Sequence, residues 1–241
     1  MEKVKFSKGG VAVEYSGNKL ENTPAEIKSN SAKRVISHFE RHVGKVISTI
    51  PDDAPNMVNI DIHIIEPSTD IPYYTLFTTG MSDLPMNPPT DLPEFKLAEL
   101  ILHLPPFWNL DPDNFDDDTI YWPVRWLRKI ARRPHEYNSW LGHTHMVPND
   151  NPDYPFSEGV GFNCWMLMMP LLMEEEFEIM QLGLHKQINF YTIFPLYDEE
   201  VQYSLDNGIE ALFNKLNKNN MKPVLQIGRK NTCKRPWWKI F

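Results

Sequence analysis

The sequence predicts an α+β fold, in which a central twisted mixed or antiparallel sheet is flanked by helices. Apolar residues recur at helical spacing in three segments, which lie near both ends and in the middle of the chain. Between them, short runs rich in β-branched and aromatic residues follow one another directly. Because helices and strands do not alternate, a doubly wound parallel sheet is not expected. The chain shows no internal repeat or low-complexity linker, which favours a single domain.

Three segments are predicted helices: 31–43, 121–133 and 198–217. Ser31 is a suitable N-cap for the first helix. Pro123 suits the first turn of the second helix, and Pro134 predicts its end. In the third helix, Asn207 and Gly208 weaken the middle, since glycine is a poor helix former.

Five segments are predicted strands: 58–65, 73–79, 97–104, 162–170 and 187–195. In the first of them, apolar residues alternate with Asn59, Asp61 and His63, which predicts a strand with one buried face. The segment 97–104 ends at two prolines, so its length leaves a strand and a short helix both open, and we favour a strand.

Charge and cysteine content exclude several classes of protein. The formal net charge is −8, and residues 51–120 carry fourteen acidic residues and one lysine, which disfavours nucleic acid as a partner. The longest apolar stretch, 165–173, contains Pro170 and is too short to cross a membrane. The first ten residues lack the apolar core of a signal peptide, and only two cysteines are present. We therefore expect a cytoplasmic protein that binds neither nucleic acid nor membrane.

Catalytic chemistry is not visible in the sequence. His143 and His145 are two residues apart, so on a strand both would point the same way, as metal ligands can. However, no HExxH motif, glycine-rich phosphate loop or GxSxG motif accompanies them. We expect no enzyme activity, cofactor or metal; as the alternative to a metal site, the histidines would form hydrogen bonds within the turn. The alternative is a hydrolase or metal-dependent enzyme using His143, His145 and a remote carboxylate. A third possibility is an oligomer assembled through Trp237 and Trp238.

Four segments together resemble the suppressor of fused domain family in its bacterial form: PYYTLFTTGMSDLPMNPP (72–89), AELILHLPPFW (98–108), YWPVRWLRKIARRPHEYNSWLGHTH (121–145) and INFYTIFPLYDEEVQYSLDNGIEALFNKL (188–216). The resemblance covers about 45–217 and implies one domain similar to the N-terminal domain of suppressor of fused. It divides the chain into an extension (1–30), the domain (31–217) and a basic, aromatic tail (218–241).

The resemblance implies binding of a protein partner or an extended peptide by addition to a sheet. Some bacterial relatives resemble immunity proteins, so a toxin is one expected partner. At the central turn the family usually has the pattern Leu-Gly-x-Gly-His-Thr-Ile-Pro-Asn-Gly. Aligning Pro148 and Asn149 with it makes His145 the family histidine, whereas aligning the His-Thr pair makes it His143.

We predict that the partner contacts the turn that follows the second helix, with help from basic residues of that helix. Aromatic residues and arginine dominate interface hot spots, and a loop rich in glycine, proline and asparagine presents side chains at the surface. The alternative is that the tryptophan of this turn belongs to the core and the arginines pair with acidic residues. The predicted binding residues are Trp140, His143, His145, Asn149, Arg125 and Arg128.

Overall fold

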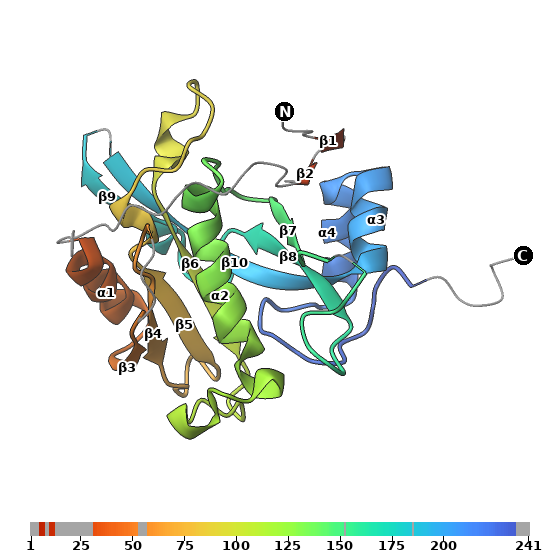
Figure 1. Ribbon diagram of the computed structural model, residues 1–241, viewed down its shortest axis with the longest axis horizontal. Coiled ribbons are helices and arrows are strands. Elements are labelled where there is room, and N and C mark those ends of the chain that lie inside the picture. Colours follow the sequence, from red (N-terminus) through yellow and green to blue (C-terminus); the bar gives the residue numbers. More distant parts are fainter. Residues whose placement is uncertain are drawn as a thin grey trace, which may run out of the picture.

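The computed structural model (Figure 1) describes residues 5–7, 10–12, 31–52, 57–151, 153–184 and 186–234. Its strands form one ten-stranded sheet in the order β1-β2-β7-β8-β10-β6-β5-β4-β3, with β9 paired to β10 beside β8. The pairs β10–β6 and β2–β7 are parallel and the others are antiparallel, so the predicted mixed sheet is confirmed. The strands are β1 (Lys5–Ser7), β2 (Gly10–Ala12), β3 (Val46–Ile50), β4 (Asp61–Ile65), β5 (Tyr74–Thr79), β6 (Ala98–Leu104), β7 (Met146–Pro148), β8 (Phe162–Met168), β9 (Ile179–Gly183) and β10 (Lys186–Tyr197).

Helices cover both faces of the sheet, and α2 crosses one of them (Figure 1). Successive residues of a strand point to opposite faces. Leu76 of β5 therefore packs in the α2 cluster while Phe77 packs against α1. Likewise, Trp165 of β8 faces α2 whereas Met166 faces α3 and α4. The helices are α1 (Ser31–His42), α2 (Asp118–Glu136), α3 (Asp198–Asn207) and α4 (Ile209–Lys218).

The first predicted helix is confirmed, but the other two differ from their predictions. Helix α2 begins after Asp117, whose carboxylate accepts a hydrogen bond from the Thr119 N–H at 2.8 Å. It continues past Pro134 to Glu136, because a proline in the last turn removes only one helical hydrogen bond. The third predicted helix is two helices, since Gly208 has a φ of 90° and interrupts the ladder between α3 and α4.

All five predicted strands are present as β4, β5, β6, β8 and β10, but the one buried face predicted for β4 is wrong. Ile62 and Ile64 lie in the α2 cluster, as the alternation indicated. His63 on the other face is also buried, and Thr49 and Thr79 form hydrogen bonds with its two ring nitrogens. The sequence prediction missed β3, β7, β9 and the two strands of the N-terminal extension, which are three to five residues long.

Residues 219–234, which we call the C-terminal segment, pack against the body of the domain. Val224 forms a parallel bridge with His103 of β6, and the Leu225 N–H donates to the His103 carbonyl at 2.8 Å. Part of the predicted tail therefore contacts the sheet, while the division of the chain at residues 30 and 217 stays a prediction. Trp237 and Trp238 lie outside the described residues. No helix in the described part of the chain is long and apolar enough to cross a membrane.

Candidate protein-binding site

The turn that leads from α2 to β7 is fixed to strand β8 by backbone hydrogen bonds. The Thr144 N–H donates to the Leu167 carbonyl at 2.8 Å, and the Leu167 N–H donates to the His145 carbonyl at 2.9 Å. Thr144 has a φ of 68°, so the two histidines do not lie on a regular strand. The expectation that they point the same way is therefore wrong, and they contact different parts of the protein.

His143 is exposed and lies against α4. Its ring is parallel to that of Phe213, with 5.9 Å between the ring centroids. The Met169 N–H donates to its Nδ1 at 3.2 Å, which places the proton of the neutral ring on Nε2. Partial burial lowers the pKa of His143, so the neutral ring predominates at pH 7. The Nε2–H group is the hydrogen-bond donor that remains for another molecule.

His145, by contrast, is buried beside Trp140. The two ring centroids are 4.4 Å apart in an edge-on arrangement, and His145 is only 3% exposed. Burial lowers the pKa of His145 to about 4. Trp140 is half-buried and also contacts Phe95, and a Cβ on Gly142 would lie 2.8 Å from the Trp140 ring. Trp140 and His145 therefore support the turn from the α2 side of the sheet.

A cavity of about 310 Å³ opens beside His143. Its walls come from the end of β8, from β10, from α4 and from the C-terminal segment. Leu171 at this cavity is 61% exposed, which shows that solvent reaches the site. The lining is mainly apolar and rich in methionine: His143, Met168, Met169, Leu171, Phe194, Phe213, Leu216, Asn217, Met221 and Pro223. Such a lining suits an apolar side chain of another molecule, because methionine adapts to different shapes.

The remaining predicted binding residues make contacts within the protein. The Asn149 amide donates to the carbonyls of Tyr154 and Pro155 and so closes the loop that follows β7. Arg128 donates to three carbonyls of the β3–β4 region, at 2.9–3.1 Å from its guanidinium: Ile50, Pro51 and Ile60. Arg125 is exposed and pairs with Asp118 of its own helix. In the described part of the chain, no hydrogen bond or ion pair joins either arginine to residues 140–149, so polar contacts do not link the six residues into one patch.

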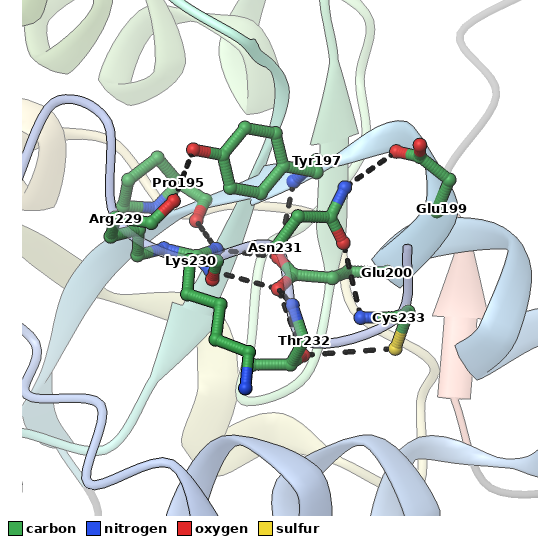
Figure 2. Close-up of polar contacts among 9 residues, drawn as sticks. All are labelled: Pro195, Tyr197, Glu199, Glu200, Arg229, Lys230, Asn231, Thr232 and Cys233. Atoms are coloured by element: carbon green, nitrogen blue, oxygen red, sulfur yellow. Dashed lines mark hydrogen bonds and ion pairs between the residues drawn. The ribbon is translucent and has the colours of Figure 1, made fainter. Parts of the chain in front are cut away.

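The C-terminal segment is held by a buried ion pair, shown in Figure 2. The Arg229 guanidinium donates to both oxygens of Glu200, at 2.8 and 2.5 Å, and to the Pro195 carbonyl at 2.7 Å. Thr232 donates to the same carboxylate through its N–H and its hydroxyl. The Tyr197 hydroxyl donates to the Arg229 carbonyl at 2.6 Å. These contacts join the C-terminal segment to β10 and α3.

The environment of this ion pair keeps the Glu200 carboxylate charged. Glu200 is completely buried, and burial by itself would raise its pKa, but the bonds and charge of Arg229 hold it below the usual value. Three aromatic rings surround the guanidinium at 4.9–5.1 Å from their centroids: Phe162, Phe194 and Tyr197. Since Met221 and Pro223 line the His143 cavity, the network also fixes one wall of that cavity. Sequence reasoning missed this pair, because Glu200 ends an acidic run and Arg229 lies in a basic one.

The described residues show no arrangement typical of an enzyme with a metal or thiol centre. They contain no group of three or more histidine, cysteine, aspartate or glutamate residues placed to hold one ion. Cys164 is 2% exposed, and burial raises the pKa of its thiol, so it packs as an apolar side chain. The alternative of an enzyme built on His143 and His145 thus finds no third ligand in the described part of the chain.

The mixed sheet and the open apolar cavity define an α+β protein with a site suited to binding. The family model for suppressor of fused protein (SUFU) matches residues 56–230, and the chain belongs to this family. A solved structure described as a SUFU homologue from Neisseria gonorrhoeae is similar, with 15% identity, a TM-score of 0.61, and coverage of 85% of this chain and 97% of the other. A chain of the Sufu–Fu complex matches with 12% identity, a TM-score of 0.56, and coverage of 83% and 91%. A search of curated protein sequences finds no match.

Proposed function

We propose that this protein is a non-enzymatic binding module that holds an extended segment of a protein partner beside His143. The observation that carries the proposal is the methionine-rich cavity, which lies next to the predicted turn and reaches solvent at Leu171. Family membership supports it, since the Sufu–Fu complex shows that a family member binds a protein. The partner places an apolar side chain in the cavity and a carbonyl group against the Nε2–H of His143.

The nature of the partner is the second part of the proposal. The resemblance to bacterial family members supports a toxin as the partner, which makes this chain a cytoplasmic immunity protein. Of the six predicted binding residues, we assign direct contact to His143 and a supporting role to Trp140 and His145. Contacts of Asn149, Arg125 and Arg128 with the partner stay predictions.

Two tryptophan variants test the cavity. Leu171→Trp places a bulky ring at the cavity, at a position that is already 61% exposed. Leu184→Trp is the matched control, because Leu184 is 96% exposed and does not line the cavity. We expect wild-type protein and Leu184→Trp to capture the same partner from the host and to bind the purified partner equally, while Leu171→Trp binds at least tenfold more weakly. Equal binding by all three proteins would exclude the cavity.

The toxin is tested separately by growth of cells that produce the captured partner. We expect growth to stop without this protein and to recover with wild-type protein or Leu184→Trp, but not with Leu171→Trp. A partner that is harmless to cells would contradict the immunity role and leave the binding role in place.

A further inference from the structure

A second cavity, of about 280 Å³, lies at the opposite edge of the sheet from β7. It is formed by the edge strand β3, by the end of β4, by the start of β5 and by the loop after β6. Its side chains combine two aromatic rings, Tyr74 and Trp108, with two carboxylates, Glu66 and Asp111. We propose that this cavity binds an arginine side chain from an extended, basic segment of a protein partner.

The charges of the cavity favour a cation. Within the described chain, no hydrogen bond or ion pair engages the exposed Glu66 carboxylate. The Asp111 carboxylate accepts the Asp113 N–H at 3.1 Å, which leaves further lone pairs for another donor. No lysine or arginine is among the residues that line the cavity. The segment that contributes most of these residues, 51–120, has fourteen acidic residues and one lysine, a composition that also favours basic partners.

The aromatic residues favour arginine over a simple metal cation. The Trp108 indole N–H donates to the Ile120 carbonyl at 3.2 Å, which holds the ring in place. Tyr74 is half-buried against the main core, so it too has a fixed position. A guanidinium group stacks on aromatic faces and also binds carboxylates through two parallel N–H groups. Two rings and two carboxylates around one cavity therefore match its chemistry.

The geometry of the edge strand β3 favours recognition of a single side chain over addition of a long strand to the sheet. Strand β3 is the last strand of the sheet, and its middle residues are exposed. Its pairing with β4 shifts register between Val46 and Ser48, so Ile47 is an extra residue in a bulge. A bulge interrupts regular pairing at a sheet edge. Ile47 is 52% exposed and lines the cavity, where it can contact the stem of an arginine.

A titration with short peptides tests this site on the complete protein. The probe is the blocked pentapeptide Ser-Thr-Arg-Thr-Ser, and its control contains citrulline, which has the shape of arginine without the charge. Binding is followed by the indole N–H resonance of Trp108 in tryptophan-labelled protein, assigned from its loss in Trp108→Phe. We expect a saturable shift with the arginine peptide and at least fivefold weaker binding of the citrulline peptide.

Two charge variants separate the cavity from general electrostatics. Glu66→Gln is expected to weaken the arginine peptide at least fivefold, whereas Asp116→Asn, which removes an exposed acid of the same loop outside the cavity, changes binding less than twofold. Unchanged melting temperatures show that both variants are folded. An unmoved Trp108 resonance, equal binding of citrulline, or equal weakening by the two variants would overturn the proposal. Leu171→Trp, which alters the His143 cavity, is expected to leave binding of the arginine peptide unchanged. A negative result with the peptides would therefore overturn the arginine site without bearing on the His143 cavity.

Discussion

Two polar regions that meet at the C-terminal segment differ in how their hydrogen bonds are satisfied. The Glu200 carboxylate is buried and receives donors from Tyr197, Arg229 and Thr232, all within the chain. His143 has one described hydrogen bond, to the Met169 N–H, and its ring reaches solvent. A buried charge must find its partners inside the fold. The ion pair therefore has a structural role, whereas His143 keeps a ring nitrogen that can serve the partner that we propose.

The largest effect is expected from breaking the ion pair. Arg229→Met leaves the Glu200 charge buried without its counter-ion, and removal of one partner of such a pair costs about 3–5 kcal/mol. Urea denaturation measures this loss. Adding Glu200→Gln to Arg229→Met is expected to restore part of the stability, since the buried charge is then absent. A loss below about 1 kcal/mol in Arg229→Met would mean that the pair is hydrated and does not hold the C-terminal segment in place.

Arg128 of helix α2 is a second charged group with its partners inside the fold. Its guanidinium donates to three carbonyls near the β3–β4 connection, so Arg128→Ala is expected to cost about 2–3 kcal/mol of unfolding free energy. The matched control is Arg125→Ala, because Arg125 is exposed and pairs with Asp118 at the surface, near the Tyr121 ring. Such surface pairs contribute roughly 0–1 kcal/mol. Thermal or urea unfolding of both variants checks the difference, and equal effects would contradict the structural role of Arg128.

The pH dependence of stability tests the buried side of the turn. The pKa of His145 is lowered to about 4, from about 6.5 in the unfolded chain, so between these values the unfolded state binds more protons. This contribution is present above pH 6.5 and is lost as the pH falls toward 4. It amounts to roughly 2 kcal/mol between pH 7 and pH 5. We expect His145→Phe to flatten the pH profile by that amount relative to wild type; parallel profiles would place His145 in contact with solvent.

Among the residues assigned to the turn, the smaller effect on stability is expected at His143. His143→Ala removes contact with the Phe213 ring and one hydrogen bond, which together stabilise the fold by about 1 kcal/mol. Binding of the partner should weaken by more than this amount if the ring contacts the partner directly. Calorimetric titration beside a melting curve compares the two quantities. A large loss of stability with unchanged affinity would instead give His143 a structural role and no direct contact with the partner.

Local sequence patterns were sufficient to predict the class of the fold and several of its elements. Helical spacing of apolar residues identified α1 and most of α2, and alternation in residues 58–65 identified the face of β4 that packs under α2. Both patterns are local, because a helix or strand repeats its buried positions every few residues. The turn after α2 was also located from its composition, together with the histidines that it carries.

Which residues come into contact depends on the three-dimensional arrangement of the elements. Glu200 and Arg229 are 29 residues apart, and nothing local distinguishes them from the other charges of their segments. Because Thr144 has a positive φ, His143 contacts α4 whereas His145 contacts Trp140. The two side chains therefore do not follow the regular alternation that their spacing predicted. Both cavities likewise combine segments that are distant in sequence. The physical reason is that periodicity reports which side of an element is buried, whereas the order of strands in the sheet decides what it is buried against.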